Sequence, residues 1–279
     1  MPEGPEVRRE ADRIQAAIVN KPLVRVEFGL PRLQRWHAAI EGSRVLAVAT
    51  RGKALLTHFD NGYSMYSHNQ LYGKWVVARA GKLPETGRSL RVGLHTASHS
   101  AVLYSASEIE VMDTQELGQH PFLRKLGPDV LDCDLTWRDV SARLRDPTFA
   151  GRSLASLYLD QGFLAGIGNY MRSEILHDAA LQPSSRPKDL TLAQIGALAR
   201  ATLTISWRAY EQAGVTNKPG RVRSLKRLGY KRRDYRFSVF DRDGLPCYRC
   251  GESVQRSEVS SRRIYFCPQC QIAAGERAS

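Results

Sequence analysis

The sequence has no run of 18 or more apolar residues, and we therefore expect no transmembrane helix. It also has no basic start followed by an apolar stretch, as a secretory signal would require. The first twenty residues instead have apolar side chains on one face of an expected helix, at Val7, Ala11, Ile14, Ala17 and Ile18. Internal repeats and low-complexity tracts are missing too. These absences predict a globular, cytoplasmic protein that is not secreted.

Acidic residues are in short supply. The chain has 28 Asp and Glu against 41 Lys and Arg, a net charge of +13 and a pI near 9.8. This imbalance favours an anionic partner, and nucleic acid is favoured over membrane because no basic amphipathic helix of the membrane type is found. Residues 218–236 contain nine of the cations and a single acid, Asp234. Such a run is typically solvated and mobile until it meets a partner.

Cysteine is scarce as well, with five in 279 residues. Cys133 stands alone, and we expect it to be a small buried or half-buried apolar side chain. The other four form the pattern Cys247-x2-Cys250-x16-Cys267-x2-Cys270. Two such pairs predict one structural Zn²⁺ in a closed four-thiolate site that holds a hairpin together, with no position open for catalysis. The spacing and the missing secretion signal argue against a disulfide framework.

The periodicity of apolar residues changes along the chain. Residues 53–68 form two β-rich arms around Asp60-Asn61-Gly62, a strong hairpin signal, and residues 90–105 predict a second hairpin. Beyond Asp134, spacings of three and four predict helices within residues 134–146, 153–165, 169–181 and 191–214. The expected fold is multi-domain α+β. Its domains are a β-sandwich with an N-terminal helix (1–124), a helical domain (125–217), and a basic loop followed by a zinc β-ribbon (218–279, with the finger at about 237–271).

Two short segments are candidates for chemistry. A small second residue permits removal of Met1, which would expose the secondary amine of Pro2. An α-amino group has a pKa of roughly 7.7–8.0, so part of it is uncharged near neutrality and can act as a nucleophile. The alternative is a disordered terminus in which Pro5 starts a helix. Residues 166–169, Gly-Ile-Gly-Asn, lie between two helical segments and are either an anion site at a helix start or a plain corner.

Together these motifs resemble the formamidopyrimidine-DNA glycosylase/endonuclease VIII repair enzymes over nearly the whole chain. The resemblance runs from residues 2–6 through Arg51-Gly52-Lys53 and residues 166–169 to the four cysteines. It implies a β-sandwich, a helix–two-turn–helix DNA-binding domain and a zinc β-ribbon. It also implies a monomer that acts on damaged double-stranded DNA.

The resemblance implies four catalytic residues. Pro2 matches the amine that attacks the sugar C1′, forms a Schiff base and drives β,δ-elimination. Glu3 matches the acid/base partner that assists sugar opening and proton transfer. Lys53 matches the hairpin lysine that contacts phosphate and assists β-elimination. Arg262 matches the finger arginine that grips the phosphates flanking the lesion.

The DNA-binding residues implied by the resemblance are of two kinds. Gln70, Leu71 and Tyr72 match the residues that fill the gap left by the flipped base. Asn169 and Lys125 match phosphate contacts, although close relatives have arginine at the Lys125 position. Lysine binds a phosphate as a point charge and cannot form the bidentate fork of arginine.

Two stretches, "PEGPE" and "SHNQLYGKW", are similar to the endonuclease VIII branch and favour oxidised pyrimidines as substrates. Two alternatives remain. One is a purine-directed glycosylase for formamidopyrimidine or 8-oxoguanine lesions on the same scaffold. The other is a non-catalytic DNA-binding zinc-ribbon protein, against which the intact Pro2, Glu3, Lys53 and Arg262 argue.

Overall fold

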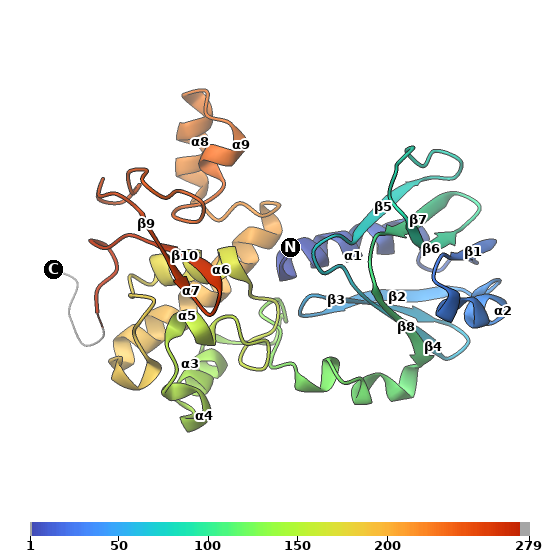
Figure 1. Ribbon diagram of the computed structural model, residues 1–279, viewed down its shortest axis with the longest axis horizontal. Coiled ribbons are helices and arrows are strands. Elements are labelled where there is room, and N and C mark those ends of the chain that lie inside the picture. The colour runs from blue at the N-terminus through green and yellow to red at the C-terminus, as the bar shows by residue number, and fades with distance from the viewer. Residues whose placement is uncertain (1, 274–279) are drawn as a thin grey trace. The chain divides into compact units, whose positions relative to one another are not determined.

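The computed structural model describes residues 2–273, so Met1, whose removal the sequence predicts, lies outside the described residues. The chain folds into two compact units that divide between Lys125 and Leu126 (Figure 1). Each unit has its own hydrophobic core. The division into three domains expected from the sequence remains a prediction.

The first unit contains two four-stranded antiparallel sheets, as expected of a β-sandwich. Their strand orders are β1-β6-β7-β5 and β2-β3-β4-β8. The strands are β1 (Arg25–Phe28), β2 (Val45–Arg51), β3 (Ala54–Phe59), β4 (Tyr63–His68), β5 (Lys74–Arg79), β6 (Leu90–His95), β7 (His99–Tyr104) and β8 (Glu108–Asp113). Short helical segments η1 (Pro31–Trp36), α2 (His37–Ile40), η2 (Thr114–Gln119) and η3 (Leu123–Lys125) complete the unit.

Both predicted hairpins are confirmed. Strands β3 and β4 pair antiparallel, and Gly62 in the turn between them has a φ of 86°, which glycine tolerates without strain. Strands β6 and β7 form the second hairpin. Local turn chemistry between two β-rich segments therefore determines this part of the fold.

Helix α1 (Gly4–Ile18) packs against strands of both sheets. Its buried face includes Val7, Ala11 and Ile14, which share one core with side chains from the two sheets. Pro5 lies in its first turn, where a missing N–H costs nothing. The helix therefore closes the core of the sandwich, and its position is set by apolar burial.

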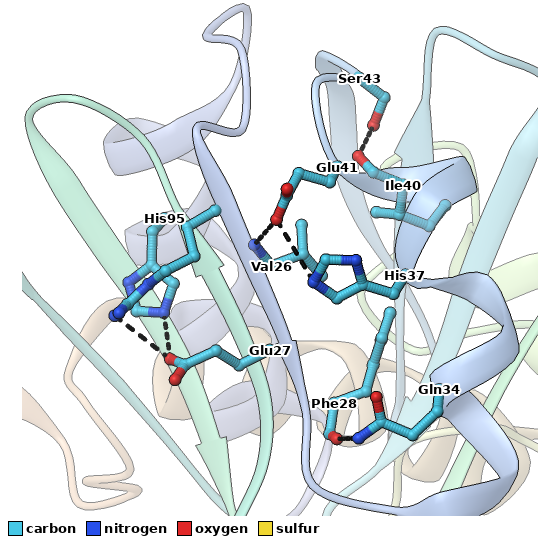
Figure 2. A network of polar contacts seen from close by, with 10 residues as sticks. Val26, Glu27, Phe28, Gln34, His37, Ile40, Glu41, Ser43 and His95 are labelled. Carbon is cyan, nitrogen blue, oxygen red and sulfur yellow. Dashed lines mark hydrogen bonds and ion pairs between the residues drawn. The ribbon is translucent and has the colours of Figure 1, made fainter.

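Side chains cover the free edge of strand β1, which pairs only with β6. The Val26 N–H donates to the Glu41 carboxylate at 3.0 Å, and the Gln34 amide donates to the Phe28 carbonyl (Figure 2). On β6, His95 Nε2 lies 2.7 Å from the carboxylate of Glu27 (Figure 2). Satisfying the edge in this way prevents it from pairing with a strand of another chain.

The second unit is mainly helical. Its helices are α3 (Trp137–Arg145), α4 (Pro147–Ala150), α5 (Leu154–Leu157), α6 (Asn169–Asp178), η4 (Pro187–Asp189), α7 (Leu192–Glu211), α8 (Pro219–Arg227) and α9 (Arg232–Tyr235). Strands β9 (Gln255–Val259) and β10 (Arg262–Phe266) form an antiparallel ribbon. Thr136 and Thr191 cap α3 and α7, so both helices begin where the sequence predicts.

Three expectations for the second unit were wrong. The helix predicted over residues 153–165 is the single turn α5, because Arg143 binds the carbonyl groups of Gly162 and Phe163 at 2.7 and 2.8 Å and holds that segment in turns. Cys133 is exposed, because it lies in a polar turn between Asp132 and Asp134. The basic run of residues 218–236, expected to be a loop, contains the helices α8 and α9.

No helix within residues 2–273 is both long enough and apolar enough to cross a lipid bilayer.

Candidate functional site

Pro2 and Glu3 lie at the start of helix α1. Pro2 is half-buried, and Glu3 is the N-cap residue with only 4% of its surface exposed. The Glu3 backbone N–H donates to the Glu6 carboxylate at 3.2 Å in a capping box. The free N–H groups and the dipole of the helix favour a carboxylate here. Glu3 is therefore a buried acidic residue at the start of the helix, next to Pro2 in the sequence.

Lys53 lies in a two-residue turn between β2 and β3, where Arg51 pairs with Ala54. Gly52, the first turn residue, has a φ of 61°, the position at which a type II′ hairpin turn requires glycine. The Lys53 side chain is half-buried, at the tip of a hairpin whose strands contact α1. Turn chemistry therefore fixes the backbone of the lysine within the same unit as Pro2.

The connection between β4 and β5 carries Gln70, Leu71 and Tyr72. Leu71 is 58% exposed and Tyr72 is 70% exposed, unusual for large apolar side chains at a turn. The Gln70 amide accepts a hydrogen bond from the Ser107 hydroxyl at 2.7 Å and donates one to the Glu108 carboxylate. Two exposed apolar side chains beside an oriented amide suit insertion between stacked bases.

In the second unit, the turn at residues 166–169 leads into helix α6. Gly166 has a φ of 98°, and the Gln161 side chain binds both the Gly166 N–H (3.1 Å) and the Ile167 carbonyl (2.9 Å). Gly168 is the N-cap residue, and Asn169 is the half-buried first residue of the helix. Turn and helix start together form the type of N-terminus that binds phosphate.

A single buried arginine connects this turn to the ribbon. Arg172, which is 0% exposed, donates to the Asn169 side chain at 3.0 Å and to the carbonyl groups of Arg262 and Arg263 at 3.1 and 3.0 Å. The side chains of Arg262 and Arg263 are exposed. The structure therefore brings Asn169 and the backbone of Arg262 into one hydrogen-bonded network. Arg262 directly follows the turn at Ser260 and Ser261, where both φ angles are positive.

The thiols of Cys247, Cys250, Cys267 and Cys270 all lie within 4.8 Å of one another. The Sγ atoms of Cys250 and Cys267 are 3.5 Å apart, and those of Cys247 and Cys270 are 3.9 Å apart. A tetrahedron with metal–sulfur bonds of about 2.3 Å has edges of about 3.8 Å, so this cluster can hold one metal ion.

A histidine from helix α6 lies beside this cluster. Burial opposes ionisation of Cys247, but the His177 ring, whose Nε2 is 3.6 Å from Sγ, and nearby backbone N–H groups lower the pKa of the thiol to about 6. A thiolate is the form that binds metal. Helix α6 therefore contacts the four-cysteine cluster through His177.

The predicted residues are divided between the two units. Pro2, Glu3, Lys53 and the loop at Gln70 belong to the first unit, which ends in η3 with the exposed side chain of Lys125. The second unit contains Asn169, Arg262 and the cysteine cluster.

Sequence reasoning missed several buried charged residues that organise these segments. Glu10 binds the loop at Gln70, Arg172 connects the turn and the ribbon, and the Glu174 carboxylate binds successive backbone N–H groups of residues 238–240. Glu10 had a detectable signal, because it interrupts the apolar face of α1 between Val7 and Ile14. Arg172 and Glu174 have no such signal in the sequence, because their partners lie far away along the chain.

Comparisons with a family model and with solved structures show the class of protein to which this fold belongs. The model of the formamidopyrimidine-DNA glycosylase N-terminal domain matches residues 1–120. A solved Lactococcus lactis Fpg in complex with DNA containing an abasic site is similar over 96% of this chain and 99% of that chain, with a TM-score of 0.80 and 21% identity. A MutM complex with DNA containing carbocyclic 8-oxo-G has a TM-score of 0.79 and 21% identity over 97% of this chain and 100% of that one. These likenesses show the fold.

Proteins of similar sequence indicate the branch within this class. An endonuclease 8 of Escherichia coli is 49% identical over 271 residues, covering 97% of this chain and 100% of that protein. Endonuclease 8 proteins of Shigella sonnei and Salmonella paratyphi B are 48% and 47% identical with the same coverage. The chain belongs to the formamidopyrimidine-DNA glycosylase/endonuclease VIII family.

Proposed function

We propose that this protein is a bifunctional DNA glycosylase and AP lyase of base excision repair, which removes oxidised pyrimidines from double-stranded DNA. The observation that carries the proposal is that Pro2 and the buried Glu3 stand next to each other at the start of α1, in a chain about half identical to endonuclease 8 proteins. Its substrate, cellular DNA, places the enzyme in the cytoplasm at the nucleoid.

The reaction begins at the Pro2 nitrogen and requires that Met1 has been removed. The uncharged amine attacks C1′ of the damaged nucleotide, the glycosidic bond breaks, and the base leaves with a proton. The nitrogen lone pair then expels O4′, which takes a proton, and the result is a cationic Schiff base (an iminium ion) between Pro2 and the sugar. This electron sink permits loss of a C2′ proton and departure of the 3′ phosphate, and a further proton loss then expels the 5′ phosphate.

The remaining catalytic residues move protons and stabilise charge. Glu3 protonates O4′ as the sugar opens and then accepts protons in the later steps. Lys53 binds a phosphate and assists β-elimination from its hairpin tip. Arg262 grips the phosphates on either side of the lesion, and the network of Arg172 supports its backbone.

The damaged nucleotide must leave the base stack before attack. Gln70 then hydrogen-bonds the unpaired base of the opposite strand, while Leu71 and Tyr72 fill the gap. Asn169 and the backbone N–H groups at the start of α6 bind phosphate, and Lys125 adds a point charge. The exposure of Leu71 and Tyr72 supports this role.

Cys247, Cys250, Cys267 and Cys270 would hold one Zn²⁺. Four thiolates would fill the coordination sphere of such an ion, so it would stabilise the ribbon and leave no position for catalysis. Its function is to fix the position of the hairpin that carries Arg262.

Borohydride trapping tests the proposal. The full chain, with its Pro2 terminus confirmed by mass spectrometry, is incubated with a duplex containing one oxidised pyrimidine, and the adduct is mapped. Hydride reduces the C=N bond of the Schiff base to a stable amine, so we expect a covalent complex at Pro2.

Two results would contradict the proposal. Trapping only on an oxidised purine would assign the protein to purine lesions. Tight DNA binding without any adduct would make it a non-catalytic binder. A duplex of the same sequence with an undamaged pyrimidine is the matched control.

A further inference from the structure

One buried carboxylate binds both ends of the loop between β4 and β5. Glu10, on α1, is 9% exposed. Its Oε2 accepts a hydrogen bond from Asn69 Nδ2 at 2.6 Å, and its Oε1 accepts one from the Trp75 N–H at 3.1 Å. Asn69 immediately precedes Gln70, and Trp75 follows Lys74 on β5. The two oxygens therefore fix the separation of the loop ends.

The chain between these ends is tightly wound. The Gly73 N–H donates to the Asn69 carbonyl at 2.7 Å, and a Cβ at Gly73 would lie 2.6 Å from both the Cα and the carbonyl oxygen of Asn69. Gln70 has a φ of 49°, an uncommon conformation for a residue with a side chain. A loop this constrained has little freedom of its own, so the position of its ends sets the direction of Leu71 and Tyr72.

Burying an ionisable side chain to hold the two loop ends costs more free energy than burying an apolar one. Placing a carboxylate in a buried site costs free energy unless hydrogen bonds or charges compensate, and an apolar side chain would fill an apolar helix face more cheaply. Here the Glu10 oxygens meet donors from the two loop ends, with the positive charges of Arg13 and Lys74 acting on them. The arrangement favours a role in fixing geometry over a role in stability alone.

We propose that Glu10 is a positioning residue for base flipping, which holds Gln70, Leu71 and Tyr72 in the orientation that enters the DNA. The inference rests on the proposed function. It adds that α1 organises two parts of the reaction, because the helix carries Pro2 and Glu3 at its start and Glu10 further along.

The test compares Glu10→Ala, Glu10→Gln and Asn69→Ala with Ile14→Ala. Ile14 is a fully buried α1 residue of the core, so its replacement destabilises the helix packing without touching the loop contacts described above. Two quantities are measured: amide hydrogen exchange at Trp75, and the ratio of excision of an oxidised pyrimidine to cleavage at a preformed abasic site. The ratio reports the steps up to base release, base flipping among them, because an abasic site has no base to unstack or to release.

We expect Glu10→Ala to speed exchange at Trp75 and to lower the ratio about tenfold or more, since small misplacements of positioned groups cost up to about 10²-fold. Glu10→Gln keeps the acceptor for Trp75 and should restore most of the ratio. Asn69→Ala should fall between them. In a Gln70→Ala, Leu71→Ala, Tyr72→Ala background, adding Glu10→Ala should change the ratio less than about twofold, because the side chains it positions are gone.

The inference is overturned if Glu10→Ala and Asn69→Ala match the wild type in both quantities, or if Ile14→Ala lowers the ratio as much as Glu10→Ala. An equal effect of Glu10→Ala in the loop-truncated background also overturns it. A wild-type enzyme that cleaves abasic sites but excises no pyrimidine would instead contradict the proposed function. Exchange at Trp75 then still tests whether Glu10 holds the loop.

Discussion

Glu3 combines a structural and a chemical role in one side chain. It caps α1 while shielded from solvent, and we propose that it also transfers protons at the sugar. Glu3→Gln keeps the shape and an acceptor for the helix start but removes the ionisable proton. We expect single-turnover base excision to fall about 10²-fold or more, with the melting temperature nearly unchanged. Excision at the wild-type rate would remove Glu3 from the mechanism.

The contribution of Glu10 to the stability of the folded protein depends on pH. Burial raises its pKa above the ordinary value of 4.5, and the hydrogen bonds from Asn69 and Trp75 offset this only in part. A raised folded-state pKa means that the contribution of the group to stability is complete below pH 4.5 and is lost as the pH rises through the folded-state pKa. The neutral amide of Glu10→Gln escapes this loss.

We therefore expect the melting temperature of Glu10→Gln, relative to wild type, to increase between about pH 4 and pH 7. Thermal unfolding of both proteins in matched buffers measures the difference. Asp12→Asn, an exposed substitution on the same helix, serves as the control. A difference that shrinks with rising pH would contradict the assigned sign.

Glu174 is a second buried glutamate whose carboxylate has several hydrogen-bond partners. Its carboxylate accepts from the backbone N–H groups of Ser238, Val239 and Phe240 at 2.8–2.9 Å and from the Thr216 hydroxyl at 2.5 Å. Glu174→Ala leaves these buried donors without an acceptor, and we expect a loss of about 3 kcal/mol or more in the free energy of unfolding. Urea unfolding measures it. Glu174→Gln, which keeps one acceptor oxygen, should lose less, and equal losses would contradict the explanation.

At the scale of helices and strands, the sequence predicts those elements that are determined by residues close together in the chain. The hairpin around Asn61-Gly62 and the capped helix starting after Thr191 follow from turn chemistry and apolar spacing. The shortening of α5 does not, because Arg143 binds carbonyl groups some twenty residues away in the sequence. The candidate site divides in the same way. Motifs point to Pro2, whereas the contacts of Glu10 in the first unit and of Glu174 in the second depend on tertiary structure.

Helices α8 and α9 form a basic arm whose cations include the exposed Lys226, Arg227 and Lys231. Each phosphate contact contributes about 0.9 to the slope of log affinity against log salt. Replacing these three residues by glutamine should reduce the slope for undamaged duplex DNA by up to about 0.9 for each lost contact. Fluorescence anisotropy at several salt concentrations measures the slope.

The matched control for the arm replaces Lys82, Arg145 and Lys188, which are exposed and lie outside residues 218–236. It removes the same charge from other surfaces. An equal change of slope in the control would mean that net charge alone acts. An unchanged slope in the arm variant would show that the arm does not contact phosphate.

For the whole molecule, the two separate cores predict that loss of the metal acts on one unit. The cysteine cluster joins the ribbon, which packs on α6, whereas the sandwich has its own core around α1. Structural zinc contributes directly to folding free energy. Cys250→Ser, or chelation of the wild type, should therefore increase amide exchange in residues 247–270 and in α6 while β3 and β4 keep their protection. Equal loss of protection in both units would show that the metal stabilises the whole chain. No change anywhere would remove the ion from the account of the ribbon.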